Sequence, residues 1–137
     1  MRHPASALIG TLFAGLLISH ASAEESVFCH VDYAGQTQIV EARPTASPYT
    51  VEAVEFGSYL LFRAVFRREP ADLASIKLYT YAQHEDIIGR PLIHQATYDY
   101  PPVPAGRYGF TGLNHAYEPR YGLVLDYWCE LRETISK

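Results

Sequence analysis

Two cysteines near opposite ends of the chain restrict the fold more than any other feature of the sequence. Cys29 lies in residues 27–33 and Cys129 in residues 121–131. Apolar and polar residues alternate in both stretches, which is typical of half-buried β-strands, and each cysteine falls on the apolar face. We therefore predict a buried Cys29–Cys129 disulfide that joins the first and last strands as a staple across the core.

The adjacent residues Cys29 and His30 suggest an alternative, a metal or redox site. The sequence has neither a Cys-x-x-Cys motif nor a third soft ligand. Metal sites built from thiolates use such spacings. We therefore favour the structural disulfide.

Residues 1–23 have the three parts of a secretory signal peptide. Arg2 and His3 give a basic start, residues 5–18 are apolar, and Ala21-Ser22-Ala23 supplies the small residues of a cleavage site. We predict a periplasmic or secreted protein whose residues 24–137 form a single β domain. The apolar stretch is shorter than the roughly 20 residues that span a bilayer, so we expect no membrane span after cleavage.

The charge of the predicted domain restricts its partners. Without Arg2 it keeps 10 of the 11 basic residues against 15 acidic ones, a net charge of −5. Nucleic acids and anionic membrane surfaces select basic patches. We therefore expect neither as a partner.

Turn residues divide the domain into about seven to eight short strands and leave little sign of helix. We expect strands at 27–33, 37–43, 49–56, 59–67, 75–83, 92–100, 110–117 and 121–131, and a polar connection at 84–90. In residues 75–83, one face carries Ile76, Leu78, Thr80 and Ala82, and the other carries Lys77, Tyr79 and Tyr81. The last two strands, 110–117 and 121–131, would form a hairpin around Glu118-Pro119-Arg120. This pattern predicts an all-β fold, either a small β-sandwich, immunoglobulin-like in the broad sense, or a barrel.

All eleven tyrosines of the chain lie in residues 24–137. Exposed tyrosines suit protein or sugar recognition, because each combines an apolar ring with a polar tip. We select as candidate binding residues the pairs at alternate positions and one residue of the following loop: Tyr79, Tyr81, Tyr98, Tyr100 and Tyr108. The alternative is that these rings fill a half-buried sheet surface.

The histidines offer a second type of site. His94 and His115 are the candidates for a copper or zinc site completed by carboxylates, but their spacing gives this alternative no support. His94 shares a strand face with Ala96 and Tyr98, which directs it toward the core or an aromatic cleft. We expect no cofactor.

Sequence motifs for a catalytic nucleophile are missing. There is neither a Gly-x-Ser-x-Gly sequence nor a glycine-rich phosphate loop. A small hydrolase would need His94 or His115 beside a carboxylate in a cleft. We do not expect an enzyme.

These observations predict an exported, non-enzymatic domain that binds another macromolecule, a protein or glycan of the cell envelope. The binding surface would be a tyrosine-rich sheet face or the loop at residues 101–108. The alternative is a periplasmic metal-handling protein that uses histidine and carboxylate ligands for copper or zinc.

Overall fold

The computed structural model describes residues 23–135 together with Gly15 and Ile18. Most of the predicted signal peptide, residues 1–23, therefore lies outside the described residues.

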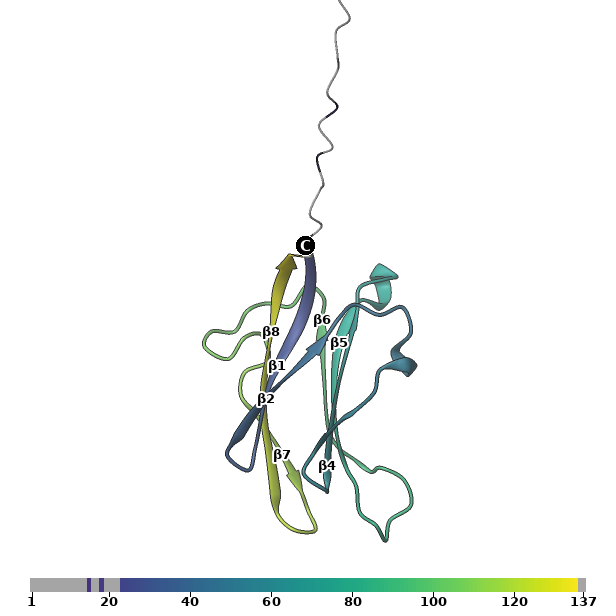
Figure 1. The fold of residues 1–137 in the computed structure, drawn as a ribbon, viewed down its shortest axis with the longest axis vertical. Coiled ribbons are helices and arrows are strands. Elements are labelled where there is room, and N and C mark those ends of the chain that lie inside the picture. Colours follow the sequence, from purple (N-terminus) through teal and green to yellow (C-terminus); the bar gives the residue numbers. More distant parts are fainter. Residues whose placement is uncertain (1–14, 16–17, 19–22, 136–137) are drawn as a thin grey trace, which may run out of the picture.

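Eight strands form two antiparallel sheets that face each other (Figure 1). Sheet A has the order β2-β1-β8-β7, and sheet B has the order β3-β4-β5-β6. The bounds are β1 Ala23–Tyr33, β2 Gln36–Ala42, β3 Val54–Phe56, β4 Leu60–Arg67, β5 Ser75–Ala82, β6 Leu92–Asp99, β7 Asn114–Glu118 and β8 Leu123–Ile135. The prediction of an all-β sandwich is confirmed, and two separate sheets take the place of the alternative barrel.

Helical structure in the described chain is limited to two short 3₁₀ segments, Pro48–Thr50 and Ala71–Leu73. Across residues 23–135, therefore, no helix has the length and apolar character needed to cross a membrane.

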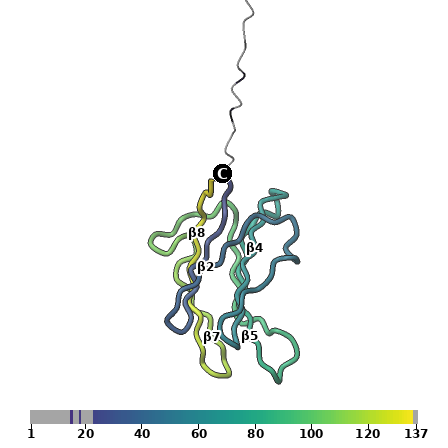
Figure 2. The backbone as a smooth tube through the Cα atoms, in the orientation of Figure 1, coloured from purple at the N-terminus to yellow at the C-terminus, as the bar shows by residue number. Residues whose placement is uncertain are grey.

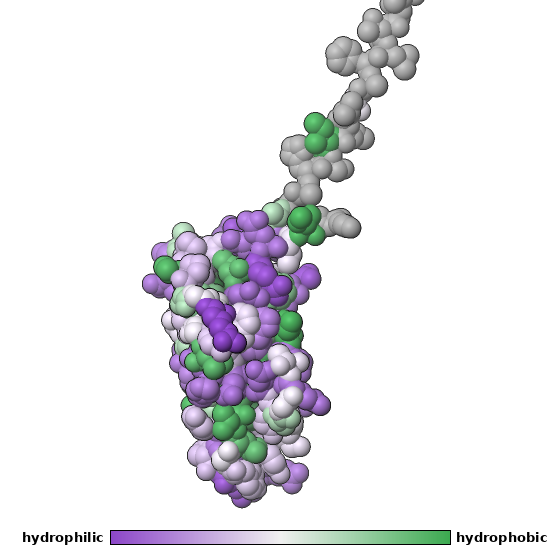
Figure 3. All heavy atoms as spheres, turned by 90° about the vertical axis from the view of Figure 1, so that its left-hand side faces the viewer, coloured by the Kyte–Doolittle hydropathy of each residue, from purple (hydrophilic) through white to green (hydrophobic). Residues whose placement is uncertain are grey.

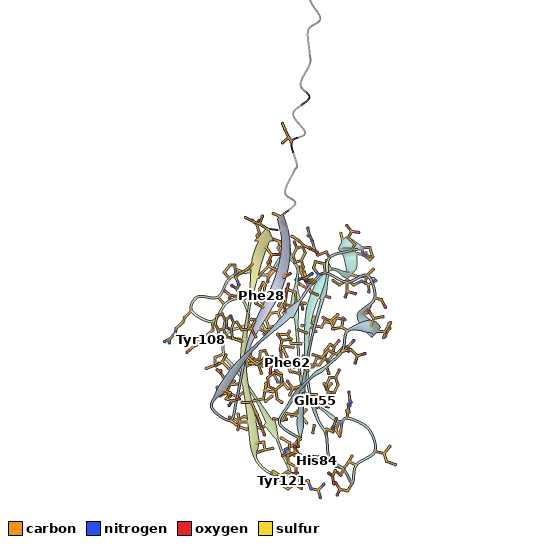
Figure 4. All side chains as sticks on the ribbon, in the orientation of Figure 1. Phe28, Glu55, Phe62, His84, Tyr108 and Tyr121 are labelled. Atoms are coloured by element: carbon orange, nitrogen blue, oxygen red, sulfur yellow. A yellow bond between two sulfur atoms is a disulfide. The ribbon has the colours of Figure 1, made fainter. Side chains whose placement is uncertain are left out.

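The core lies between the sheets, where the apolar faces of the strands meet. Phe62 of β4, labelled in Figure 4, and Tyr127 of β8 are both fully buried and pack across the interface, with ring centroids 5.0 Å apart. The expected alternation holds along β5, where Ile76, Leu78 and Thr80 point inward and are 0% exposed. Period-two patterning therefore predicted the buried face of this central strand correctly.

The predicted disulfide is confirmed. Cys29 and Cys129 are register partners on β1 and β8, with Cα atoms 4.1 Å apart, and both are fully buried. The bridge joins two neighbouring strands within sheet A, however, and does not cross the core as expected. The first and last strands are direct neighbours, and this pairing brings residues 23 and 135 together at one end of the sandwich.

Two predicted strands are shorter in the structure than expected. Residues 49–53 do not belong to a sheet, because Pro48 begins a 3₁₀ turn, and only Val54–Phe56 pairs with β4. Similarly, residues 110–113 form turns that end at Asn114, with Gly112 at a φ of +69°. These turn segments contain apolar residues at the same spacing as a strand. Alternation in the sequence therefore cannot distinguish them from strand residues.

The connection between β6 and β7 returns along the upper half of β8 and extends sheet A locally (Figure 2). The Phe110 amide donates a hydrogen bond to the Cys129 carbonyl at 3.0 Å. A Cβ atom on Gly109 would lie 2.0 Å from that carbonyl oxygen, so this approach requires glycine. It places the preceding residue, Tyr108, beside β8.

Loss of the disulfide should destabilise the domain without changing its fold. The bridge closes a loop with a sequence separation of 100 residues, for which the chain-entropy model gives about 4–5 kcal/mol, an upper value. We expect Cys29→Ala/Cys129→Ala to lower the free energy of unfolding by up to that amount in chemical denaturation, with an unchanged far-UV spectrum. Reduced wild-type protein keeps both sulfur atoms and isolates the effect of the bond. Equal stability of its oxidised and reduced forms would contradict the prediction.

Candidate functional site

Tyr79 and Tyr81 point outward from β5, on the face of sheet B that turns away from sheet A. Their rings stack, with centroids 6.1 Å apart and planes 14° apart. The guanidinium of Arg63, the register partner of Tyr79, lies 5.3 Å from the centre of the Tyr79 ring. Both tyrosines are half-buried. The structure therefore brings these two candidates together on one surface.

Part of this outer face is covered by the segment before β3. Arg63 donates hydrogen bonds to the carbonyls of Pro48 and Val51, the latter at 2.9 Å. Val65 also points outward from β4, but it is 3% exposed because the segment around Pro48 packs over it. The exposed surface around Tyr79 and Tyr81 is consequently small.

Tyr98 and Tyr100 lie elsewhere, against the core between the two sheets. The Tyr98 ring meets Phe110 edge-on at 5.2 Å, and burial raises the pKa of its hydroxyl. The Tyr100 ring is 5.3 Å from Phe66, and its hydroxyl donates to a carboxylate oxygen of Glu25. These two candidates therefore do not share a surface with Tyr79.

Tyr108 lies on the opposite side of the molecule, over the outer face of sheet A (Figure 4). Its ring is 6.1 Å from that of Trp128, the single tryptophan of the chain. Trp128 stacks in turn on His30 of β1, with ring centroids 3.8 Å apart and planes 4° apart. We define the Trp128 cluster as the aromatic and charged residues that are in contact here: Phe28, His30, Tyr108, Trp128, Glu130 and Arg132.

Polar contacts hold the cluster together. His30 Nε2 lies 2.9 Å from Glu130 Oε1, and Arg132 Nε donates to the same oxygen at 3.1 Å. The Arg132 guanidinium lies 4.1 Å from the centre of the Phe28 ring. Each aromatic ring of β1 and β8 in the cluster thus has a positioned polar neighbour, so the surface is preorganised.

The surroundings of the Trp128 cluster are partly apolar and exposed. Ile39 of β2 and Tyr117 of β7, on strands that flank the central pair, are 53% and 62% exposed. Figure 3 shows this side of the molecule, where green apolar residues are scattered among purple hydrophilic ones. An open hollow of about 280 Å³ adjoins the cluster at Glu130, lined by Pro102, Pro104, Gly109, Phe110, Glu130 and Leu131.

Sequence reasoning missed most of the Trp128 cluster. Alternation in residues 121–131 places Trp128 and Glu130 on the polar face of the strand, and alternation in residues 27–33 does the same for Phe28 and His30. The pairing of these strands was implied by the disulfide. An antiparallel pairing with Cys29 opposite Cys129 would have placed His30 opposite Trp128.

A second polar site closes the end of the sandwich that lies opposite the chain termini. His84, just after β5, and Glu118, the last residue of β7, are 6% and 0% exposed. His84 Nε2 lies 2.9 Å from Glu118 Oε1 and thereby connects sheet B with sheet A. The carboxylate also accepts hydrogen bonds from the amides of Arg120 and Tyr121, both at 2.7 Å.

These contacts determine the ionisation of Glu118. Burial, the largest single influence, raises its pKa, but the amides of Tyr121 and Arg120 together with His84 outweigh it and hold the pKa below the ordinary 4.5. Glu118 is therefore a buried carboxylate at neutral pH. Sequence reasoning took His84 for part of a polar loop. The signal it overlooked is that Thr80, Ala82 and His84 continue one inward-facing series.

The two histidines considered for a metal site lie apart. His94 Nε2 lies 2.7 Å from the Tyr127 hydroxyl, and burial lowers the pKa of this histidine. His115 pairs with Asp126 at 2.5 Å on the outer face of sheet A. Within residues 23–135, the structure does not gather three histidine, cysteine, aspartate or glutamate side chains around a point that could hold a metal ion. The metal-handling alternative gains no support from this geometry.

Comparison with known proteins adds no assignment: no family model, curated protein or solved structure matches this chain.

Glu118→Gln tests the buried site. An amide accepts through one oxygen, so at least one of the three hydrogen bonds is lost, at a cost of about 1–3 kcal/mol. Because the folded pKa of Glu118 is lowered, its carboxylate stabilises the fold above the unfolded pKa near 4.5, and this contribution disappears as pH falls through the folded pKa. Denaturation at a series of pH values should show the difference between wild type and variant shrinking in acid. Glu52→Gln, at an exposed position, is the control. A difference that stays constant down to the acid limit would exclude a lowered pKa.

Proposed function

We propose that this chain is an exported, non-enzymatic domain that binds another protein through the Trp128 cluster and the adjoining loop at residues 101–108. The observation that carries the proposal is the packing of Trp128, Tyr108 and Arg132 on an open sheet face. Tryptophan, tyrosine and arginine are the residue types most enriched among those that dominate protein–protein binding energy.

The state of the aromatic rings favours a protein over a glycan. Sugars bind by stacking on an open ring face, whereas here His30 covers one face of Trp128, and Arg132 and Arg107 lie over the rings of Phe28 and Tyr108. Protein partners can use ring edges, the guanidinium groups and the neighbouring hollow instead.

Export rests on the sequence of residues 1–23 and agrees with the disulfide. Cysteine pairs persist in oxidising compartments such as the periplasm and the extracellular space. A periplasmic or secreted location therefore fits both features.

Tyr79 and Tyr81 remain a second candidate surface for the same function. Their stacked rings and the Arg63 guanidinium also form an aromatic and cationic surface. The smaller exposed area of this face makes it the second choice.

Export can be tested on the protein made by its own organism. We expect the mature chain to begin at Glu24, which removes Ala23, the first residue of β1. Intact mass measurement of the protein from the periplasm or culture fluid checks this. An unprocessed chain retained in the cell would contradict export.

Binding can be tested by comparing two sets of variants as bait. Wild-type domain, Trp128→Ala, Tyr108→Ala/Arg132→Ala and Tyr79→Ala/Tyr81→Ala would each be immobilised and exposed to the envelope and culture-fluid proteins of the source organism. We expect a protein that wild type captures to be lost with both variants of the Trp128 cluster and retained with the Tyr79/Tyr81 variant. The purified partner should then bind Trp128→Ala at least about 30-fold more weakly, as expected for a dominant interface residue.

The double variant guards against loss of folding, since Arg132 is exposed and Tyr108 lies in a loop. Thermal unfolding and circular dichroism identify variants that keep the fold. A partner lost with Tyr79→Ala/Tyr81→Ala and retained by both cluster variants would move the function to sheet B. If the immobilised domain binds only a glycan and no protein, the partner is a sugar and the proposal of a protein partner is wrong.

A further inference from the structure

His94 lies on the inner side of β6, which is an edge strand of sheet B. β6 pairs with β5 alone, and among the described residues no backbone hydrogen bond is made to its other edge. The half-buried imidazole reaches across to sheet A, where its Nε2 lies 2.7 Å from the hydroxyl of Tyr127, a fully buried residue of β8. His94 and Tyr127 therefore form a polar contact between the edge strand and the opposite sheet.

His94 differs from the other histidines of the described chain in what it faces. The other three each lie against a carboxylate: His30 against Glu130, His84 against Glu118 and His115 against Asp126. Within residues 23–135, His94 forms no such pair. A buried charge is costly unless an opposite charge compensates it, so protonation of His94 would place an uncompensated charge between the sheets.

The groups that face His94 cannot supply the missing negative charge. On β5 its register partner is Thr80, whose buried hydroxyl has no hydrogen-bond partner among the described residues. Burial raises the pKa of the Tyr127 hydroxyl and that of Tyr98, on the same face of β6, so both stay neutral. On the inner face of β7 (Asn114–Glu118) the one charged residue is Glu118, which is already engaged in the buried pair at the end of the sandwich.

This environment makes the contact sensitive to acid. Burial lowers the pKa of His94 below its ordinary 6.5. If β6 separates from β8, the imidazole meets water and regains the ordinary pKa. The open form then binds more protons than the closed form, so acid favours opening. The closed form keeps its full stability above about pH 6.5 and loses stability as the pH falls from there toward the lowered pKa.

We propose that His94 and Tyr127 form an acid-sensitive latch, and that protonation of His94 frees the edge strand β6 while the rest of the sandwich stays folded. β6 can open alone because it pairs on one side only, whereas β5 keeps its pairing with β4. β6 leads directly into the loop at residues 101–108, so the latch also controls the near end of that loop.

The latch is a property of the free domain and goes beyond the proposed protein-binding function. It does not require a partner at the Trp128 cluster, and binding at that cluster does not require the latch. Failure of one proposal therefore leaves the other standing.

Amide hydrogen exchange of the expected mature protein, residues 24–137, measures opening strand by strand when it is followed by nuclear magnetic resonance. Rates corrected for the intrinsic effect of pH give the protection of each amide at pH 7 and pH 5. Between these values we expect β6 to lose protection by up to about 25-fold, the limit for a histidine that is neutral when closed and has its ordinary pKa when open. The central amides of β1 and β8 should change far less. The Glu118 carboxylate does not interfere, because its pKa lies below 4.5.

Variants assign the effect to His94. His94→Gln keeps a side chain that can hydrogen-bond to the Tyr127 hydroxyl and cannot be protonated, so the protection of β6 should no longer depend on pH. His115→Gln is the matched control. It removes an exposed histidine that is paired with Asp126 on the outer face of sheet A, and it should behave like wild type.

A direct titration of the His94 ring signals in wild-type protein keeps the proposal testable if His94→Gln fails to fold. We expect a midpoint below 6.5. Four results would overturn the proposal: a midpoint at or above 6.5, equal protection of β6 at both pH values, an unchanged acid effect in folded His94→Gln, or an equal loss of protection in β6 and in the centre of sheet A. The last result would mean that acid unfolds the whole domain.

Discussion

Cys29 and Cys129 face each other across β1 and β8, and the arrangement of sheet A depends on this pairing. The two strands match residue for residue from Ala23–Ile135 to Asp32–Asp126, and the disulfide lies within that run. A covalent bond at one pair excludes any shift of register, and a shift by one residue would exchange the buried and exposed faces of both strands. The bridge therefore determines which side chains meet on each side of the sheet.

The outer face of sheet A follows directly from this register. His30 meets Trp128 because both are one residue from the disulfide, on the opposite face of the sheet. Tyr108 joins them because Gly109 lets the loop approach the Cys129 carbonyl. The proposed binding surface is thus assembled around the same pair of residues that stabilises the fold.

The two ends of the sandwich are closed by different interactions. At the end with the chain termini, the long β1–β8 pairing extends to Ala23 and Ile135. At the other end, the buried His84–Glu118 pair joins the sheets, and Glu118 also holds the turn between β7 and β8 through two backbone amides. Burial of this polar pair leaves His84 Nδ1 without a hydrogen-bond partner among the described residues.

By itself, the sequence determined the all-β class, the disulfide and the inward faces of β1, β5 and β8, since period-two alternation and cysteine pairing are local or compositional signals. It could not separate the tyrosines by role: Tyr79 and Tyr81 are on an outer face, whereas Tyr98 and Tyr100 pack toward the core. It also missed that His84 is buried against Glu118, 34 residues away. Alternation tells which way a side chain points along its own strand. The neighbour that it meets is decided by strand order, register and loop path, and these depend on contacts between distant residues that only the tertiary structure brings together.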